Sequence, residues 1–313
     1  MPIKFAVVMD PLEQLNPNKD SSLAMLEEAQ NRGWQTYYIN PHSLAFEETA
    51  IAHCEPIKLQ LNQEDWYQLA EPEQRPLSDL DIIIMRVDPP FNMAYIYMTY
   101  LLELAEQAGV LVVNRPQSLR DANEKLFTLQ FPQCCAPTLV ASNMAQLKSF
   151  QKKHEDIIVK PLDGMGGASI FRIQQDDPNI SVIFETMTQH GTLPIIAQRF
   201  IPEISQGDKR ILLVDGEPIP YALARIPAKG ETRGNLAAGG RGVGVELTER
   251  DQWICEQIGP KLCKMGLSFV GVDVIGDYVT EINVTSPTCI RELDKLYELN
   301  ISKTLLDALE NKI

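Results

Sequence analysis

Three oxygen-bearing side chains, Asp273, Glu281 and Asn283, lie in a stretch from Phe269 to Pro287 that otherwise alternates apolar and small residues like a pair of strands. Acidic groups in such a pattern are costly to bury without a partner. Mg²⁺ is a suitable partner, because it takes carboxylate oxygens and leaves other positions to phosphate oxygens. The pattern indicates an enzyme that holds a nucleotide through a metal. The alternative is a hairpin whose acidic residues face water.

The turn of this hairpin decides whether the three side chains share a face. Side chains alternate along a strand, and directly opposed residues of a hairpin share a face. A two-residue turn at positions 276–277 would pair Asp273 with Thr280 and put Glu281 on the other face. We predict instead a turn centred on Asp277, which pairs Asp273 with Glu281 and leaves the asparagine on the same face.

Composition limits the class of protein. The chain has 313 residues, of which 44% are hydrophobic, enough for two or three domains. No apolar run reaches the length of a membrane span, and the first residues enter a strand rather than a signal peptide. The formal charge of −14 argues against binding to nucleic acid or anionic membranes, so an anionic substrate must meet a local cluster of Arg and Lys.

Cysteine usage indicates a reducing compartment. The six cysteines show no zinc-binding spacing, which favours reduced thiols in a cytoplasmic protein. Cys289 directly follows the acidic segment and is a candidate nucleophile. With no histidine nearby in the sequence, we disfavour that role.

The first 115 residues alternate strands and helices. This order predicts a parallel sheet covered on both faces, with ligands at the carboxyl ends of the strands, where Arg86 and Asp88 fall. No GxGxxG motif follows the first strand, so a dinucleotide site is disfavoured. The predicted strands are 3–9, 34–39, 81–86 and 110–113, and the predicted helices are 20–33 and 94–107.

The rest of the chain reads as α+β with small antiparallel sheets. We predict a helix over 119–129 capped by Ser118, and an exposed hairpin over 210–221 that turns at Asp215-Gly216. Further predicted strands are 138–140, 157–160, 169–173 and 195–200, and further helices are 144–153, 180–189, 248–265 and 301–310.

A glycine-rich loop follows the strand that ends at Lys160. Glycines allow consecutive N–H groups to point inward as an anion-binding nest, and the lysine adds positive charge. The loop lacks the order of a P-loop, so a plain glycine hairpin is the alternative. The loop residues singled out for phosphate are Gly164, Gly166 and Gly167.

Other candidate ligand-binding residues lie near the following strand and hairpin. A strand end with an apolar wall suits a purine, Asp208 could accept from ribose hydroxyls, and Arg210 and Arg225 suit phosphate and transition-state charge. The alternatives are a buried strand end and exposed rim charges. The strand-end residues are Gln198, Arg199, Phe200 and Ile201.

A stretch over 227–244 interrupts the pattern. Between Gly230 and Gly244 it holds six glycines and almost no large apolar group, so it cannot pack a core. We interpret it as a lid whose Arg233 and Arg241 close over anionic groups and exclude water. A linker is the alternative.

Together these features resemble an ATP-grasp ligase, with Lys125 and Lys160 on nucleotide phosphates and an Asp/Glu/Asn metal cluster. Over nearly the whole chain the resemblance is closer to the bacterial glutathione synthetase family. It rests on the strings Met9-Asp10-Pro11, Arg86-Val87-Asp88-Pro89-Pro90-Phe91, Asn114-Arg115-Pro116-Gln117-Ser118-Leu119-Arg120-Asp121, Lys160-Pro161-Leu162-Asp163-Gly164-Met165-Gly166-Gly167, Thr232-Arg233-Gly234-Asn235-Leu236-Ala237-Ala238-Gly239-Gly240 and Glu281-Ile282-Asn283-Val284-Thr285-Ser286-Pro287-Thr288.

The resemblance implies an architecture and an activity. The fold would be an N-terminal parallel α/β domain (1–122) followed by an ATP-grasp fold of two α+β subdomains (123–201 and 202–313), the second with a mobile loop at 227–244. The activity would join γ-glutamylcysteine and glycine to glutathione through an acyl phosphate, giving ADP and phosphate. The alternatives are an ATP-grasp ligase with another acceptor amine and a non-catalytic nucleotide sensor, which would lack Lys160 or the metal carboxylates. A cytoplasmic homotetramer with no nucleic-acid or membrane partner is expected.

The resemblance also implies residue roles. Mg²⁺, or Mn²⁺ as an alternative, would be held by Asp273, Glu281 and Asn283. ATP would be held by Lys125, Lys160, Gly164, Gly166, Gly167, Gln198, Arg199, Phe200, Ile201 and Asp208, and the catalytic charges would be Arg210 and Arg225. The carboxylates of the dipeptide and of glycine would meet Arg86, Arg233, Asn235, Arg241 and Ser286.

Overall fold

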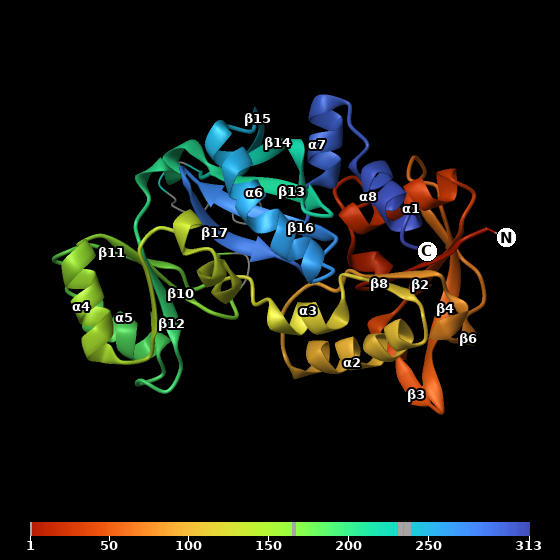
Figure 1. Cartoon of the computed structure of the whole chain (residues 1–313), viewed down its shortest axis with the longest axis horizontal. Coiled ribbons are helices and arrows are strands. Elements are labelled where there is room, and N and C mark those ends of the chain that lie inside the picture. The colour runs from red at the N-terminus through yellow and green to blue at the C-terminus, as the bar shows by residue number, and fades with distance from the viewer. Residues whose placement is uncertain (1, 165–166, 229, 231–233, 235–238) are drawn as a thin grey trace.

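The computed structural model describes residues 2–164, 167–228, 230, 234 and 239–313. Within them the chain forms three sheets placed side by side, with helices on their faces (Figure 1). The N-terminal sheet lies at one end, a small four-stranded sheet lies at the other, and a five-stranded sheet lies between them. No helix of the described residues is both long and apolar enough to cross a bilayer.

The N-terminal sheet contains the predicted parallel strands. They are β1 (Lys4–Val8), β2 (Gln35–Ile39), β7 (Ile82–Met85) and β8 (Leu111–Val113), in the order β2-β1-β7-β8. Helices α1 (Ser21–Asn31) and α2 (Met93–Gln107) begin at the caps Asp20 and Asn92. All four residues of β7 are buried, which is typical of parallel strands covered on both faces.

An antiparallel extension of this sheet is absent from the sequence prediction. Its strands are β3 (Ala45–Glu47), β4 (Thr49–Leu59), β5 (Tyr67–Leu69) and β6 (Glu73–Pro76). Strand β4 runs antiparallel to β2 and pairs with the other three. Strands β3, β5 and β6 are short and largely exposed, whereas β4 is long and alternates buried with more exposed residues over its first half. The first sheet is therefore mixed.

The small sheet is antiparallel, as predicted. It has the order β11-β10-β12-β9 and is covered by α4 (Met144–His154) and α5 (Ile180–Met187). Its strands are β9 (Thr138–Ala141), β10 (Ile157–Pro161), β11 (Phe171–Ile173) and β12 (Ile195–Arg199).

The predicted helix over 119–129 is wrong. Helix α3 (Pro116–Asp121) ends before it, and a 3-10 helix (Leu126–Gln130) follows. The Asn123 side chain interrupts the helix, because its oxygen accepts the Lys125 and Leu126 N–H groups at 3.1 and 2.9 Å. Ser118 caps nothing. It lies inside α3 and donates to the Met265 carbonyl at 2.5 Å.

The five-stranded antiparallel sheet has the order β15-β14-β13-β16-β17. The predicted Asp215-Gly216 turn joins β13 to β14, and both residues have positive φ. The hairpin is not exposed as predicted, because β13 is a buried central strand. The strands are β13 (Asp208–Val214), β14 (Glu217–Ile226), β15 (Arg241–Glu246), β16 (Phe269–Ile275) and β17 (Tyr278–Asn283).

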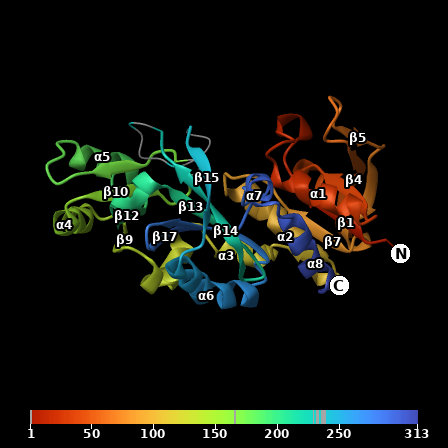
Figure 2. The ribbon, with the colours of Figure 1, turned by 90° about the horizontal axis from the view of Figure 1, so that it is seen from above.

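Three helices complete this part of the chain. They are α6 (Glu249–Lys264), α7 (Ile290–Tyr297), which the sequence analysis missed, and α8 (Ile301–Glu310). The C-terminal α8 lies beside the N-terminal α1 (Figure 2), where Arg32 pairs with Asp307 at 2.7 Å. The two ends of the chain are thus packed together.

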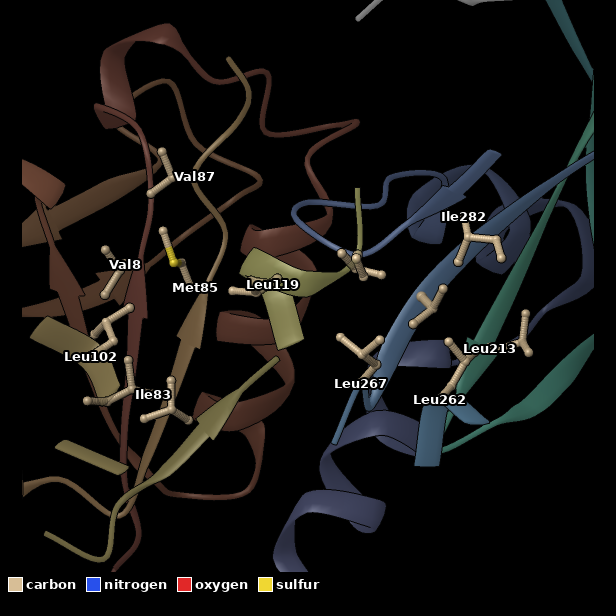
Figure 3. Packing of buried hydrophobic residues seen from close by; sticks show 14 of the residues in the cluster. Val8, Ile83, Met85, Val87, Leu102, Leu119, Leu213, Leu262, Leu267 and Ile282 are labelled. Atoms are coloured by element: carbon tan, nitrogen blue, oxygen red, sulfur yellow. The ribbon is translucent and has the colours of Figure 1, made fainter. Parts of the chain in front are cut away.

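The N-terminal sheet and the five-stranded sheet share a hydrophobic core. One cluster joins Val8, Met85 and Leu119 of the N-terminal region to Leu213 and Ile282 of the five-stranded sheet (Figure 3). The small sheet has a separate cluster of its own, which includes Leu147 and Phe184 and, among the described residues, none from outside 139–197. The small sheet therefore packs as a separate unit, whereas the other two share their cores.

Candidate active site

A cavity of about 340 Å³ lies where the three sheets meet. Asp88 and Pro89 line it from the N-terminal sheet, Lys160 and Gln198 line it from the small sheet, and Asn283 lines it from the five-stranded sheet. All three parts of the chain therefore contribute to one site. Both signs of charge face the cavity.

The β16–β17 hairpin carries the predicted metal cluster, but its turn differs from the prediction. Ile275 pairs directly with Tyr278, so the turn has only the two residues Gly276 and Asp277. Gly276 takes a φ of +55°, as the first central residue of a tight hairpin turn does. The prediction of a turn centred on Asp277 is therefore wrong.

A bulge restores the predicted pairing one step further along the hairpin. Val274 pairs with Val279, yet Asp273 pairs with Glu281, so Thr280 is an extra residue on β17. Its hydroxyl donates to the carbonyl of Asp273 at 3.3 Å. The opposition of Asp273 and Glu281 is confirmed, although the bulge and not the turn produces it.

Asp273 lies at the buried centre of the site and is bound by two arginines. Its Oδ2 is 2.8 Å from Arg210 Nη2 and 2.9 Å from Arg225 Nη2, and Arg210 Nε also contacts Oδ1. Burial would raise the pKa of Asp273, but the two guanidinium charges outweigh it and hold the pKa at about 2. Asp273 is only 2% exposed.

Arg225 also binds Asp208, so it connects two carboxylates. The distance from Arg225 Nη2 to Asp208 Oδ2 is 2.5 Å. Burial raises the pKa of Asp208 to about 6, with Arg225 opposing the shift and the charges of Asp273 and Glu281 adding to it. The other oxygen of Asp208 is buried and has no hydrogen-bond partner among the described residues.

Glu281 faces the cationic side of the cavity. Its carboxylate lies 3.8 Å from Lys160 Nζ and 4.0 Å from Lys125 Nζ. Lys125 also donates to the Gly164 carbonyl at 2.6 Å and contacts Glu124, a cavity residue that the sequence analysis missed. Burial and then the charge of Glu281 raise the pKa of Glu124, while Lys125 lowers it.

The oxygen atoms near Glu281 are suited to a hard cation, but they do not all come from acidic side chains. Within the described ranges no three His, Cys, Asp or Glu side chains are grouped to hold a metal. The Glu281 carboxylate and the Asn283 amide line the cavity, whereas the Asp273 carboxylate is bound by arginines and by Asn283 Nδ2 at 3.2 Å. Glu281 and Asn283 thus fit Mg²⁺ directly, and Asp273 lies behind them.

The end of β12, which the sequence analysis predicted to hold a purine, lies at the cavity wall. Gln198, Arg199, Phe200 and Ile201 all line the cavity. Gln198 is buried and donates to Thr138 Oγ1 at 3.2 Å. The Arg199 guanidinium donates to the Tyr278 hydroxyl at 3.1 Å, which links the small sheet to the β16–β17 hairpin.

Among the predicted carboxylate-binding residues, Arg86, Ser286 and Arg241 are described, and only Ser286 lines the cavity. Arg86 is buried away from the cavity lining, where it donates to Ser22 Oγ at 3.1 Å and to the Pro287 carbonyl at 2.9 Å. Ser286 lines the cavity and contacts Asp88. Arg241 is exposed at the start of β15, outside the lining. Gly166, Arg233 and Asn235 lie outside the described residues.

The stretch predicted as a lid is partly a strand, since β15 pairs with β14 along its whole length. Gly234, in the middle of the stretch, is buried and lines the cavity. A Cβ at this position would lie 2.5 Å from the Arg225 carbonyl oxygen, so only glycine fits.

Cys289 also lines the cavity, which the sequence analysis did not establish. Burial raises the pKa of its thiol, although Arg210 and Arg225 oppose the shift. A raised pKa disfavours the thiolate, so the structure gives no support to a cysteine nucleophile.

A cavity between a small antiparallel sheet and a larger one, with lysines, arginines and oxygen donors converging on it, defines this protein as an ATP-grasp ligase. Family models agree: the ATP-grasp domain of prokaryotic glutathione synthetase matches residues 124–298, and its N-terminal domain matches residues 3–120. The chain belongs to the prokaryotic glutathione synthetase family.

Individual relatives agree with the family models. The chain is 57% identical over 311 residues to glutathione synthetase of Pseudomonas aeruginosa, covering 99% of this chain and 98% of the relative. It is 55% identical over 312 residues to that of Escherichia coli K12, covering 99% of both chains.

Solved structures support the fold alone. A D-cycloserine synthetase has a TM-score of 0.68 at 13% identity, covering 97% of this chain and 99% of the other. A RiPP-associated ATP-grasp ligase of Chryseobacterium gregarium has a TM-score of 0.67 at 16% identity, covering 99% of this chain and 98% of the other.

Proposed function

We propose that the cavity between the three sheets is where ATP-dependent glutathione formation takes place, and that the reaction passes through an acyl phosphate. The cysteinyl carboxylate of γ-glutamylcysteine would attack the γ-phosphorus, forming a P–O bond and releasing ADP. The glycine amine would then attack the acyl carbon, and the C–O bond to phosphate would break as the amine loses a proton. One observation carries the proposal: two lysines and two arginines converge with Glu281 and Asn283 around one cavity.

For the nucleotide we propose four sets of contacts. Lys125 and Lys160 would hold the phosphates, because both ammonium groups lie within 4.0 Å of the Glu281 carboxylate at the cavity wall. The loop with Gly164, Gly166 and Gly167 would cover the phosphates, and the β12 end from Gln198 to Ile201 would hold the adenine. Asp208 would accept from the ribose.

Mg²⁺, or Mn²⁺ in its place, would be held by Glu281 and Asn283, with Asp273 as a further ligand only if it releases an arginine. A bound divalent cation would offset the charge of the phosphates. The amide of Asn283, which touches Asp273, and the carboxylate of Glu281 are fixed by the paired strands that carry them.

Arg210 and Arg225 would stabilise the charge of the phosphoryl and tetrahedral species. Both are buried and fixed by carboxylates, so they are already oriented before substrate arrives. No protein nucleophile is needed in this scheme.

For the substrate carboxylates we propose Arg233, Asn235 and Arg241, and Ser286 if its hydroxyl turns from Asp88 to the substrate. For Arg86 we propose a positioning role, because its side chain holds the Pro287 carbonyl directly after Ser286.

The test is ADP release with γ-glutamylcysteine, with and without glycine, and with D-alanine as the control amine. We expect glycine to give stoichiometric ADP, phosphate and glutathione, and D-alanine to give little product. Coupled turnover with D-alanine but not with glycine would establish a ligase of a different acceptor.

We also propose a homotetramer in the cytoplasm. All six cysteines are free, which suits a reducing compartment. Helix α2 exposes an apolar stripe at helical spacing, a feature of protein interfaces. Its residues are Met93, Tyr97, Tyr100 and Leu104. Light scattering after gel filtration should give four times the monomer mass, and Tyr97→Glu should lower it.

A further inference from the structure

A single carboxylate marks the end of the cavity that the N-terminal sheet forms. Asp88 follows β7, at the carboxyl end of the parallel strands, and is exposed to the cavity. The adenine wall at the end of β12 belongs to the small sheet, which lies on the other side of the five-stranded sheet (Figure 1). Asp88 is therefore on the side where the peptide substrate, and not the nucleotide, would bind.

The neighbours of Asp88 fix its position. Its N–H donates to Asp10 Oδ2 at 2.9 Å, and its Oδ1 accepts from Ser286 Oγ at 2.5 Å. These bonds join the ends of β1 and β7 to the segment after β17. One carboxylate oxygen of Asp88 is left without a hydrogen bond within the described part of the chain.

The charge around Asp88 differs from that of the other acids in the cavity. Glu124 is paired with Lys125, Asp208 with Arg225 and Glu281 with Lys160. No lysine or arginine of the described ranges forms an ion pair with Asp88. A carboxylate that lines a cavity without a cationic partner is suited to a cationic group of a ligand.

Two buried donors belong to residues near this end that do not themselves line the cavity. Arg86 Nη1 and Tyr95 Oη are buried without hydrogen-bond partners among the described residues, in side chains only 5% and 1% exposed. Native structures rarely leave buried donors unpaired, so a bound molecule or its ordered water is expected beside them.

We propose that Asp88 binds the α-ammonium group of the γ-glutamyl residue of the dipeptide substrate. The inference rests on the proposed function. γ-Glutamylcysteine carries one free ammonium group, at the end of the molecule away from the reacting cysteinyl carboxylate. Placing that group on Asp88 would orient the dipeptide with its cysteinyl carboxylate toward Arg210 and Arg225, so Asp88 would select substrates that have a free α-amino group.

The test compares γ-glutamylcysteine with N-glutarylcysteine, which lacks only the α-amino group, in wild type and in Asp88→Asn. We expect wild type to prefer the amino substrate in kcat/KM by roughly ten- to hundredfold, as for loss of a charged hydrogen bond. Asp88→Asn should lose most of this preference by raising the KM for the dipeptide, with the KM for ATP unchanged. Circular dichroism would verify that the variant is folded.

Asp81→Asn is the matched control, because Asp81 lies at the opposite end of β7, where its carboxylate accepts the Lys4 N–H at 2.7 Å. It should keep the wild-type preference. Retention of the full preference in Asp88→Asn, no preference in wild type, or a change confined to the KM for glycine would each overturn the proposal. Failure of wild type to make glutathione from γ-glutamylcysteine would instead refute the proposed function.

Discussion

Two arginines and two carboxylates form a continuous ion-pair network under the cavity. Arg225 lies between Asp208 and Asp273, and Arg210 binds Asp273 from the other side. The sequence analysis placed Asp273, Glu281 and Asn283 in one metal cluster, whereas the structure gives these residues two different roles. Asp273 orients the arginines, whereas Glu281 and Asn283 face the cavity.

Arg225→Ala tests this network. We expect kcat to fall by about 10²–10³ with a smaller change in the KM for ATP, because the guanidinium would act on transition-state charge. Stability should fall by about 3–5 kcal/mol, since Asp208 loses its ion-pair partner and the buried Asp273 loses one of its two arginines. Steady-state kinetics and urea unfolding measure both. Arg115→Ala, which removes an exposed partner of Glu106, should change stability by less than about 1 kcal/mol. A pure KM effect for ATP would contradict the role.

Glu281→Gln tests the metal ligand. We expect the Mg²⁺ concentration for half-maximal activity to rise at least about tenfold and turnover to fall, with the fold intact, because a neutral amide is a weaker ligand for Mg²⁺. A Mg²⁺ titration of the rate measures this. Glu217→Gln makes the same change at an exposed position of β14 and should titrate like wild type. Normal kinetics of Glu281→Gln at low Mg²⁺ would exclude the ligand role.

At the scale of elements, small irregularities decide where side chains point. The extra residue Thr280 in β17 compensates for the tight turn at positions 276–277, so that Glu281 opposes Asp273. The Asn123 side chain ends the helical run before Lys125, which allows that lysine to reach the Gly164 carbonyl. Both are local departures from regular structure, and both place a cavity residue.

Helix α7 carries a titratable residue whose effect on stability has a definite sign. Burial raises the pKa of Asp294 to about 6, opposed by a hydrogen bond from the Ile301 N–H and by Arg291. The unfolded value is about 3.9. Between about pH 4 and 6 the folded state therefore binds more protons than the unfolded state, and stability falls as the pH rises through this window.

Asp294→Asn keeps an acceptor for Ile301 and removes the charge. Its stability relative to wild type should rise by about 1–2 kcal/mol between pH 4 and 7, after allowance for the partial exposure of the carboxylate. Urea unfolding at the two pH values measures this. Asp307→Asn should show the opposite pH dependence, and only below about pH 4, because hydrogen bonds from Lys303 and Arg32 lower the pKa of Asp307 and its contribution is lost as the pH falls through that lower pKa. The same difference in unfolding free energy between Asp294→Asn and wild type at both pH values would contradict the prediction.

At the scale of the whole molecule, the N-terminal and five-stranded sheets form one body and the small sheet a second. Asn114 joins the first two. It donates to the carbonyls of Phe269 and Val284 at 2.8 and 2.7 Å and accepts from the Phe269 N–H at 3.0 Å. The small sheet has a core of its own, and the Arg199–Tyr278 hydrogen bond at 3.1 Å links it to the β16–β17 hairpin.

Asn114→Ala should therefore destabilise the protein strongly. We expect the free energy of unfolding to fall by about 3 kcal/mol, because three hydrogen bonds to buried backbone groups disappear together. Thermal or urea unfolding measures it. Gln117→Ala, an exposed amide on α3, should stay within about 0.5 kcal/mol of wild type. Equal stabilities of the two variants would show that Asn114 does not hold the sheets together.

The sequence by itself determined most elements, the parallel N-terminal strands, the small antiparallel sheet and the family, because these depend on local periodicity and contiguous strings. The opposition of Asp273 and Glu281 was predicted correctly, but from a turn centred on Asp277 that the structure does not have. The strands over 45–76 were not predicted, because β3, β5 and β6 are short and largely exposed and a proline and charged residues interrupt the alternation of the long strand β4.

Tertiary structure alone decided the partners of the charged side chains. Asp273 and Arg210 are 63 positions apart, and Arg86 reaches Pro287 over 201 positions. Residue types show that such groups need partners, but the partner is selected by strand order and register, which depend on packing over the whole chain. The tight turn with its bulge, the arginine network behind the metal ligands and the buried place of Arg86 all have this origin.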